Sequence, residues 1–337
     1  MFLSHQGRRE VASDQAPHHC RNSHEESLVL TLTSDKLTRM AITTTEHDPP
    51  PVRIGIVGAG PWATIYHAPI FSACSDTVVA GVWARRADAA ATLAEAHAAP
   101  AYTSFDELLD NVDALSFAVP PPIQASLAER GARSGKALLL EKPLALDLES
   151  ARSLARVVEE TGVPTQLLLT WRYAPRVRQF LNEISGRRAL GAQARFMTGG
   201  FLGGPFATPW RLEHGAVMDL GPHVIDFLDA ALGPVVEISA RGSRRDWVSL
   251  SLRHESGAVS QAAITATCAL DDVRAGAEVY FDDGVSTIDT TTMSVSAAST
   301  VASEFAAVVR SGRPHALDVQ RGLYLQELLT TAAADIP

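Results

Sequence analysis

Short apolar runs alternate with amphipathic stretches from residue 51 to about residue 170. The runs are continuous, as in strands that are buried on both faces of a sheet. Capping residues support the helices between them, since Glu107 lies three positions after Ser104 and Asp147 precedes another helical stretch. This alternation predicts βαβ units and a doubly wound parallel sheet. We expect strands over Val52–Val57, Val78–Trp83, Ala114–Val119, Ala137–Leu140 and Gln166–Thr170, and helices over Trp62–Phe71, Ala87–His97, Phe105–Leu109, Gln124–Ser134 and 148–161.

The pattern changes beyond residue 170, where extended stretches follow one another with short turns and little helix between them. Such a series predicts an antiparallel sheet. The predicted fold class is therefore α/β, with the parallel sheet over residues 51–170 and an α+β domain with an open, mainly antiparallel sheet over residues 171–337. In this second part we expect strands over Gln193–Thr198, Val235–Arg241, Val248–His254, Val259–Thr267 and Ala277–Phe281, and helices over Pro175–Glu183, Ala216–Leu232, Val301–Ser311 and Val319–Ala332.

Residues 1–50 lack both periodicities and are polar, which predicts a disordered tail and linker. His18 and His19 beside Cys20 are side chains of the metal-ligand type, but such a tail offers no folded frame to hold them. We therefore predict no metal site.

The composition is that of an ordinary globular protein, with 46% hydrophobic and 20% charged residues in a chain of 337. The formal net charge is −9, and no stripe of Lys and Arg with interleaved aromatic residues is present, which argues against a nucleic-acid partner. No apolar run approaches the roughly 18 residues of a membrane span, and no signal-peptide core is present. The three cysteines lie far apart and form no CxxC pair. We therefore expect a cytoplasmic protein without membrane contacts.

A glycine-rich segment lies between the first predicted strand and the first predicted helix. Gly58 permits a tight turn there, Gly60 lets the backbone approach a pyrophosphate, and Ala63 allows close packing of helix on strand. The helix N-terminus, where Pro61 has no helical N–H to lose, presents free donors to an anion. The segment predicts a dinucleotide-binding loop, and the alternative is a tight turn that holds no ligand. The expected cofactor contacts of the loop are Gly58, Gly60, Pro61 and Trp62.

The residues after the second predicted strand bear on the choice between NAD and NADP. An NAD site should present an acidic residue about 20 residues beyond the loop, where it binds the ribose hydroxyl groups. No acidic residue appears there before Asp88, whereas Arg85 and Arg86 can pair with a 2′-phosphate. The sequence therefore favours NADP over NAD. In the alternative interpretation, both arginines are ordinary solvated residues and either cofactor is accepted.

Three further segments carry a resemblance to a known family. They are Glu141-Lys142-Pro143-Leu144, Trp171-Arg172-Tyr173, and residues 215–226 with the pattern Asp219-x-Gly221-x-His223. In order and spacing they resemble the glucose-fructose oxidoreductase and inositol dehydrogenase (Gfo/Idh/MocA) family, over roughly residues 52–330. The resemblance implies a Rossmann domain followed by an α+β domain. It also implies homodimers or homotetramers that assemble through the open sheet.

Lys142, Asp219 and His223 are the candidate catalytic residues. Oxidation of an alcohol by a nicotinamide needs a base for the hydroxyl proton, and the pKa of a histidine suits that task. Asp219 lies four residues before His223, so both can share one helix face, although Pro222 can kink the helix. Lys142 follows a parallel strand, where such folds bind ligands, and its ammonium can polarise the substrate oxygen. Each residue taken alone has an ordinary structural role open to it, but the resemblance assigns catalytic roles to all three.

The resemblance also places residues around the cleft. At the cofactor we expect Pro120, which ends a strand, together with Glu141, Lys142 and Arg172. At the substrate, where rings can stack on a sugar or an arginine can hold a carboxylate, we expect Trp171, Tyr173, Trp210 and Arg211. The alternative for the tryptophans is packing in the core. The sequence departs from the family at Gln124, where a histidine is frequent, and His67 matches a frequent family position without an evident task.

The predicted function is an NAD(P)-dependent oxidoreductase that transfers hydride between a nicotinamide and a sugar, a cyclitol or a related small polar alcohol or carbonyl compound. Two alternatives remain open on the sequence. One is redox-neutral chemistry of the lyase or glycosidase type with a bound cofactor, and the other is a non-catalytic NADP-binding regulatory protein. The retained set of candidate catalytic residues favours the oxidoreductase.

Overall fold

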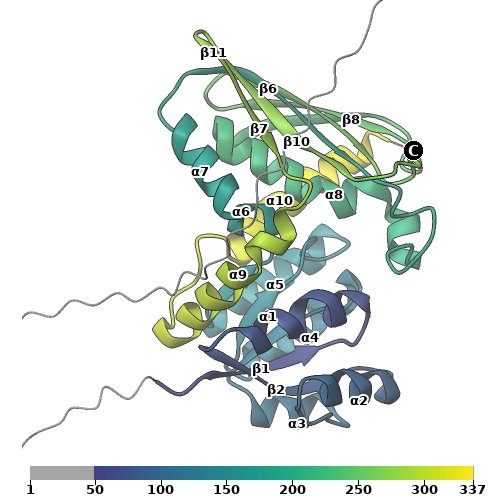
Figure 1. Cartoon of the computed structure of the whole chain (residues 1–337), viewed down its shortest axis with the longest axis vertical. Coiled ribbons are helices and arrows are strands. Elements are labelled where there is room, and N and C mark those ends of the chain that lie inside the picture. Colours follow the sequence, from purple (N-terminus) through teal and green to yellow (C-terminus); the bar gives the residue numbers. More distant parts are fainter. Residues whose placement is uncertain (1–48, 337) are drawn as a thin grey trace, which may run out of the picture. The chain divides into compact units, whose positions relative to one another are not determined.

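The computed structural model describes residues 49–336, so the predicted tail, with the residues considered for metal binding, lies outside this range except for its last two positions. Five parallel strands form the first sheet, in the order β2-β1-β3-β4-β5 (Figure 1). The strand order reverses beside β1, which has β2 on one side and β3 on the other, and such a switch point opens a crevice at the carboxyl ends of the strands. The strands are β1 (Val52–Val57), β2 (Thr77–Trp83), β3 (Ala114–Phe117), β4 (Ala137–Leu140) and β5 (Thr165–Leu167).

The helices between these strands lie where they were predicted, but two of them begin differently. The first begins as a π-helical turn, η1 (Ala63–His67), before α1 (Ala68–Ala73), and turns of this kind are frequent at functional sites. Another, α4 (Pro121–Arg133), begins three residues earlier than predicted, because prolines fit the first turn of a helix, where no N–H donor is needed. The other helices are α2 (Ala87–Ala96), α3 (Phe105–Asn111) and α5 (Leu148–Thr161).

Both predicted helix caps are confirmed. Ser104 accepts a hydrogen bond from the backbone N–H of Glu107, whose carboxylate accepts one from the backbone N–H of Ser104, so a complete capping box begins α3. Asp147 accepts from the backbone N–H of Ser150 at the start of α5.

Six strands form the second sheet, in the order β11-β10-β6-β9-β8-β7. Only the central pair of β6 and β9 runs parallel, and the other pairs are antiparallel, which confirms the predicted mainly antiparallel sheet. The edge strand β11 was not predicted, because it is short and buries one side chain, Ile288. The strands are β6 (Ala189–Met197), β7 (Val235–Gly242), β8 (Val248–His254), β9 (Val259–Thr265), β10 (Arg274–Phe281) and β11 (Gly284–Asp289).

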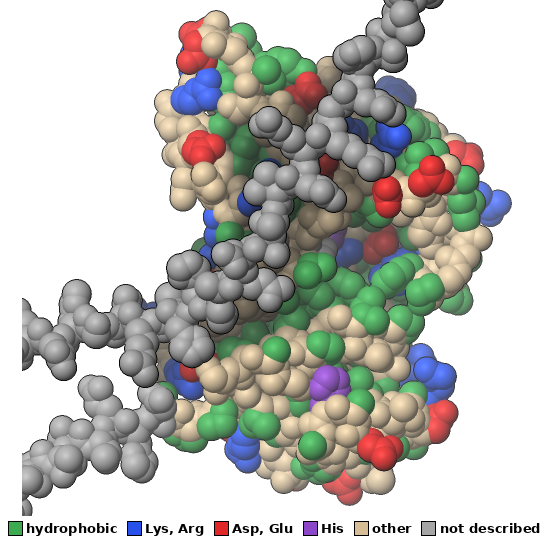
Figure 2. All heavy atoms as spheres, in the orientation of Figure 1, with side chains coloured by type: hydrophobic (Ala, Val, Ile, Leu, Met, Phe, Trp, Pro, Cys, Tyr) green, Lys and Arg blue, Asp and Glu red, His purple; other side chains and the backbone are tan. Residues whose placement is uncertain are grey.

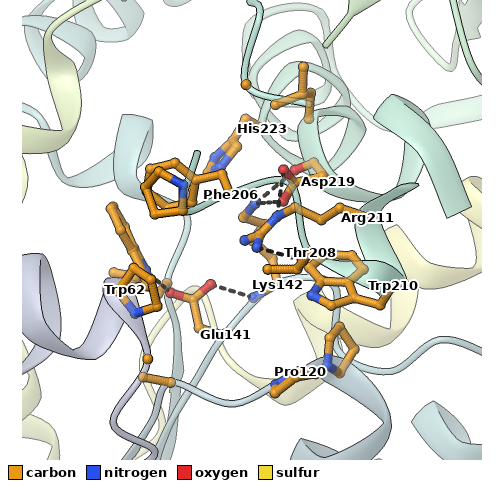
Figure 3. Close-up of a pocket in the computed structure, with 18 of the residues that line it drawn as sticks. Trp62, Pro120, Glu141, Lys142, Phe206, Thr208, Trp210, Arg211, Asp219 and His223 are labelled. Atoms are coloured by element: carbon orange, nitrogen blue, oxygen red, sulfur yellow. Dashed lines mark hydrogen bonds and ion pairs between the residues drawn. The ribbon is translucent and has the colours of Figure 1, made fainter. Parts of the chain in front are cut away.

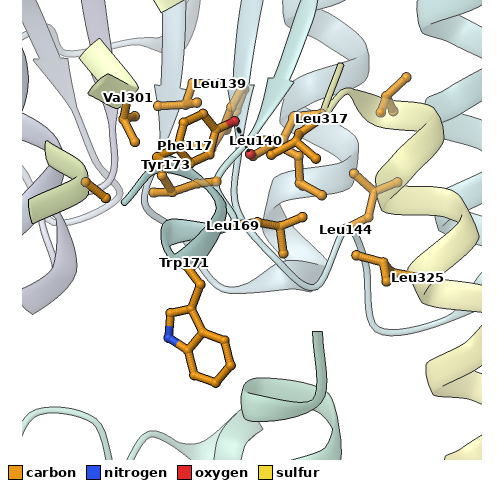
Figure 4. Packing of buried hydrophobic residues seen from close by; sticks show 14 of the residues in the cluster. Phe117, Leu139, Leu140, Leu144, Leu169, Trp171, Tyr173, Val301, Leu317 and Leu325 are labelled. Atoms are coloured by element: carbon orange, nitrogen blue, oxygen red, sulfur yellow. Dashed lines mark hydrogen bonds between the residues drawn. The ribbon is translucent and has the colours of Figure 1, made fainter. Parts of the chain in front are cut away.

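The helices of the second part connect the two sheets. α8 (Pro209–Leu232) contacts β6, β8 and β9, so it covers the inner face of the mixed sheet. The last two helices, α9 (Met293–Ser311) and α10 (Val319–Ala334), return to the first sheet, where α9 contacts β1 and β2 and both contact β5. Figure 4 shows the result, with Val301 of α9 beside Phe117 and Leu139 of the parallel sheet.

The segment after β5 departs from the prediction. The strand was expected to continue to Thr170, but it ends at Leu167 and Thr170 begins a single helical turn, α6 (Thr170–Tyr173), which is followed by α7 (Pro175–Ile184). Among the described residues, no helix combines the length and the hydrophobicity that crossing a bilayer would require.

Candidate active site

A cavity of about 410 Å³ lies at the carboxyl ends of the parallel strands. Residues that follow β1, β3, β4 and β5 line one side of it, and α8 with the loop between β6 and α8 lines the other. A second cavity of about 310 Å³ lies at the ends of β1 and β2 and shares Gly60, Ala118, Val119 and Pro120 with the first, so the two adjoin. Figure 2 shows charged and histidine side chains set back in a hollow, with hydrophobic side chains along its border.

The glycine-rich loop lines both cavities. Gly58 has φ +112°, and a Cβ at this position would lie 2.4 Å from the carbonyl oxygen of Ala118, so only glycine fits the turn. A Cβ at Gly60 would meet no protein atom within 4 Å, because it would enter open space. The fold therefore needs a glycine at Gly58, whereas at Gly60 the absent side chain leaves room beside the loop. That room, at the N-terminal end of a helix, suits a pyrophosphate.

The second cavity is lined by residues at the end of β2 and the start of α2, among them Arg85 and Arg86. Both arginines are exposed, and neither forms a salt bridge within residues 49–336. Trp83 and Ala84 precede them in the lining, so no carboxylate stands where β2 ends. The arrangement leaves two cations beside the place where the adenosine end of a dinucleotide would lie.

Gln124 fixes the segment that carries Lys142. Its side-chain amide donates to the backbone oxygens of Glu141 at 2.8 Å and Leu144 at 3.2 Å, and it accepts from the backbone N–H of Glu141 at 2.8 Å. The residue that departs from the family pattern is therefore fully buried and holds the backbone on both sides of Lys142.

Lys142, Asp219 and Arg211 form a connected charge cluster at the cavity (Figure 3). Lys142 Nζ donates to Asp219 Oδ1 at 2.9 Å and to the backbone oxygen of Asp219 at 2.7 Å, while Arg211 Nε donates to Asp219 Oδ2 at 3.0 Å. Burial raises the pKa of Asp219, but the two cations outweigh it, so the pKa lies below its usual range. The carboxylate thus stays charged and orients both cations.

Asp219 and His223 share one face of α8, as predicted, and both line the cavity. Pro222 lies inside the helix without moving either side chain off that face. The helix is interrupted earlier, at the non-helical residue Gly215, and this break lets Arg211 approach Asp219.

His223 is buried, with its ring stacked on Trp171 at a centroid distance of 5.7 Å. Its Nδ1 atom is buried and has no hydrogen-bond partner, so Nε2 is the nitrogen that can serve the cavity. Burial and then the Lys142 cation lower the pKa of His223 well below its usual range, against the opposing effect of Asp219. The imidazole is therefore neutral near pH 7 and able to accept a proton.

His67 belongs to a hydrogen-bonded chain that the sequence did not reveal. Its Nδ1 lies 2.7 Å from Ser116 Oγ, and its Nε2 lies 3.0 Å from Glu141 Oε1. Because a carboxylate only accepts, Nε2 carries the hydrogen in the bond to Glu141. Trp62 Nε1 also donates to Glu141 Oε1, at 2.6 Å, so the chain orients the indole that lines the cavity.

Most of the predicted site residues lie at the two cavities. Among those expected at the cofactor, Gly58 and the two arginines line the second cavity, Gly60 and Pro120 line both, and Pro61, Trp62, Glu141 and Lys142 line the first. Trp210 and Arg211, expected at the substrate, also line the first cavity, together with Asp219 and His223.

The Trp171-Arg172-Tyr173 segment requires a correction, because none of its residues lines either cavity. Tyr173 is fully buried in the core, where its hydroxyl donates to the backbone oxygen of Leu167 (Figure 4). Arg172 pairs with the buried carboxylate of Asp226 at 3.1 Å instead of reaching the cofactor site. Trp171 packs behind His223, so the core-packing alternative holds for this tryptophan.

Three phenylalanines that sequence reasoning missed complete the cavity. Phe196 is the next-to-last residue of β6, and Phe201 and Phe206 lie on the loop that precedes α8. The ring of Phe206 packs edge-on against Trp62, at a centroid distance of 6.1 Å (Figure 3). The glycine- and proline-rich composition of this loop, residues 199–205, was the one available signal.

Comparison with known proteins agrees with the geometry. Two family models match the chain in order, an oxidoreductase family with an NAD-binding Rossmann fold over residues 52–168 and a Gfo/Idh/MocA C-terminal domain over residues 188–287. D-apiose dehydrogenase of Paraburkholderia graminis is 29% identical over 171 residues, which are 45% of this chain and 43% of that protein. UDP-N-acetylglucosamine 3-dehydrogenase of Acidithiobacillus ferrooxidans is 31% identical over 175 residues, 52% of each chain. The chain thus spans about half the length of these curated relatives.

Among solved structures, GenD2 from gentamicin A biosynthesis, in complex with NAD, has the same fold. The TM-score is 0.76 at 23% identity, and the superposition covers 86% of this chain and 95% of that chain. The two matched domains, in this order and with this fold, place the chain in the Gfo/Idh/MocA family of oxidoreductases.

Proposed function

We propose that this protein is an NAD(P)-dependent dehydrogenase or reductase that acts on the CH–OH or carbonyl group of a sugar, a cyclitol or a related small polar compound. The observation that carries the proposal is the convergence of Lys142, Asp219 and His223 on a cavity that adjoins the glycine-rich loop. The two dehydrogenases named above, which act on D-apiose and on UDP-N-acetylglucosamine, support this reaction class. No observation favours redox-neutral chemistry or a non-catalytic regulatory role.

The residues present fit a nicotinamide dinucleotide. The space beside Gly60, which a Cβ would enter, suits the pyrophosphate, and the cavity with Arg85 and Arg86 suits the adenosine end. Pro120 is shared by both cavities, and Trp62, with its indole held by Glu141, lines the one beside the nicotinamide end. When bound, the nicotinamide exchanges a hydride with the substrate carbon.

The side chains of this chain handle the oxygen and the proton. In the oxidation direction, the Lys142 ammonium beside the substrate oxygen lowers the pKa of the hydroxyl group. His223, kept neutral by its lowered pKa, takes the hydroxyl proton on Nε2. Asp219 holds the ammonium in place through Oδ1 and its backbone oxygen, so it acts mainly by positioning Lys142. In the reduction direction the same groups return the proton to the oxygen.

The proposal includes a preference for NADP over NAD. Arg85 and Arg86 line the cavity at the adenosine end, without salt-bridge partners among the described residues. Arginine matches phosphate geometry well, and no carboxylate is placed there to bind a ribose 2′-hydroxyl.

We also propose that copies of the chain assemble into dimers or tetramers through the outer face of the second sheet. Val259, Tyr280 and Val285 stand exposed on the outward positions of three strands of this sheet. Light scattering after size exclusion tests this proposal, and a monomer at micromolar concentration would refute it.

The function is tested by following absorbance at 340 nm with NADP⁺ or NAD⁺ and a panel of sugars, cyclitols and hydroxy acids. Lys142→Met and His223→Gln should each lower the turnover rate by roughly 100-fold or more, as expected for loss of an electrostatic or acid–base group. His223→Gln should bind NADPH as the wild type does, which intrinsic fluorescence can measure, whereas Lys142 is also expected to contact the cofactor. Turnover unchanged in Lys142→Met would refute the assignment, and a protein that binds neither nucleotide would refute the whole proposal.

A further inference from the structure

The first cavity is walled by aromatic rings from both domains. Trp62 comes from the Rossmann domain, and four further rings come from the second part of the chain. Apolar residues complete this wall on both sides of the cavity. The aromatic residues are Trp62, Phe196, Phe201, Phe206 and Trp210, and the aliphatic ones include Leu168, Leu220 and Val273.

The cavity is lined by charged donors, Lys142 and Arg211, and by side chains that can also accept, namely four threonines and His223. Gln124 and Glu141 also line it, but Gln124 is engaged with the backbone, and Glu141 accepts from Trp62, His67 and the backbone N–H of Lys142. The charged donors are Lys142 and Arg211, and the remaining carboxylate, Asp219, already binds both.

Charge is unbalanced within the cluster of Lys142, Asp219 and Arg211, where two cations share one carboxylate. The other carboxylate at the cavity, Glu141, is engaged by Trp62, His67 and the backbone N–H of Lys142. The lowered pKa of His223 keeps the imidazole neutral near pH 7, so it does not alter this balance. An excess cation in a largely buried site attracts an anion.

Arg211 is held ready to bind such an anion. Its Nε donates to Asp219 and its Nη1 to Thr208 Oγ1 at 3.3 Å, and its guanidinium carbon lies 4.6 Å from the Trp210 ring and 5.6 Å from the Phe206 ring. Within residues 49–336, Nη2 makes no hydrogen bond. The guanidinium is therefore fixed by one carboxylate and two rings, with one nitrogen left for a ligand (Figure 3).

We infer that the substrate of this enzyme carries a carboxylate beside its reacting carbon and an apolar body, as in a 2-hydroxy acid with an aryl or alkyl side chain. Arg211 binds the carboxylate, Lys142 binds the reacting oxygen, and the aromatic wall takes the apolar body. This inference rests on the proposed hydride-transfer function and narrows the substrate class of that site.

The test uses the full chain saturated with its preferred oxidised nucleotide and four probe compounds. Both enantiomers of mandelate combine a carboxylate with an aryl group, and 1-phenylethane-1,2-diol replaces the carboxylate by a neutral CH₂OH group. Gluconate keeps the carboxylate on a hydroxylated body, and myo-inositol has neither feature. Calorimetry measures binding, and absorbance at 340 nm measures turnover.

We expect one enantiomer of mandelate to bind at least about tenfold more tightly than the diol, since a charge-assisted hydrogen bond is lost in the diol. Gluconate should bind more weakly than mandelate because its body is hydroxylated, and myo-inositol should bind most weakly. Arg211→Met should weaken the binding of mandelate by about tenfold or more, whereas the affinity for the diol should change by less than about twofold. The control Arg253→Met removes an exposed arginine that pairs with Glu237, and all affinities should be unchanged.

The inference is overturned if myo-inositol binds as tightly as mandelate, or if Arg211→Met weakens the binding of mandelate and of the diol equally. In both of these outcomes, turnover of a neutral polyol with a high kcat/KM would still support the proposed oxidoreductase function. Failure of the proposed function looks different, because neither nucleotide would then be reduced or bound, whichever probe is present.

Discussion

Two glycines of the same loop should respond differently to the same added methyl group. Gly58→Ala places a Cβ 2.4 Å from the Ala118 carbonyl oxygen at φ +112°. The backbone strain alone costs about 1–3 kcal/mol, and relief of the clash adds to it, so we expect a loss of about 2–5 kcal/mol in the free energy of unfolding. Gly60→Ala meets no protein atom within 4 Å and lies outside the left-handed region, so stability should change by less than about 0.5 kcal/mol.

The effect of Gly60→Ala should appear in cofactor binding instead. The methyl group enters the space proposed for the pyrophosphate, and loss of one charge-assisted hydrogen bond, worth about 1.5–3 kcal/mol, weakens NADPH binding by about 10- to 150-fold. Thermal unfolding measures stability, with a shift of about 2–4 °C per kcal/mol expected for a chain of this size. Fluorescence titration measures NADPH binding.

Gly162→Ala supplies the matched control for backbone strain without a clash. Gly162 has φ +68° with no atom within 4 Å of an added Cβ, so the variant should lose about 1–2 kcal/mol in the free energy of unfolding, less than Gly58→Ala. Its NADPH binding should be normal. Wild-type NADPH affinity in Gly60→Ala would refute our placement of the pyrophosphate. A stability loss at Gly60 as large as at Gly58 would refute the distinction between the two positions.

The remaining predictions concern the site. The double variant Arg85→Ala/Arg86→Ala should lose NADPH affinity by about tenfold or more and keep NADH affinity, and equal losses for both nucleotides in titrations would contradict the 2′-phosphate role. The lowered pKa of His223 predicts that kcat/KM stays level as the pH falls through 6.5, the usual histidine value, and drops only below it. The imidazole of His223 takes up a proton near that pH in the unfolded chain but not in the folded one, so the free energy of unfolding should decline as the pH falls below 6.5. Denaturant melts should show a smaller decline in His223→Gln. Gln124→Ala leaves the backbone of Glu141 without its buried partners, so we expect a loss of about 2–4 kcal/mol in denaturant melts, which Gln124→Glu should not fully restore.

The catalytic candidates were accessible to sequence reasoning because local geometry constrains them. Asp219 and His223 are four residues apart on a helix, and Lys142 follows a buried parallel strand, so their shared place was predicted from helix period and strand direction. The structure brings them together with a hydrogen bond from Lys142 Nζ to Asp219. Their catalytic roles stay predictions that the variants above test.

Arg172 and Tyr173, which were wrongly predicted to line the cleft, were misplaced for a different reason. Arg172 and Tyr173 are adjacent on the single turn of α6, and sequence proximity to a cleft does not determine where such side chains point. The buried carboxylate of Asp226 draws Arg172 away, and the core encloses Tyr173. In the same way, the role of His67 depends on Ser116, which lies on β3, and on Glu141, which directly follows β4.

Local sequence was enough to predict the alternation of elements, both helix caps, the glycine-rich loop and the motif residues, because each depends on neighbours within a few positions along the chain. Long-range packing is what lets Gln124 hold the backbone around Lys142 and lets Arg211 share Asp219 with the lysine. It also decided which aromatic rings wall the cavity. These contacts join residues that are distant in sequence, and their partners are selected by how α8 and the loop before it pack against the parallel sheet, which no local periodicity encodes.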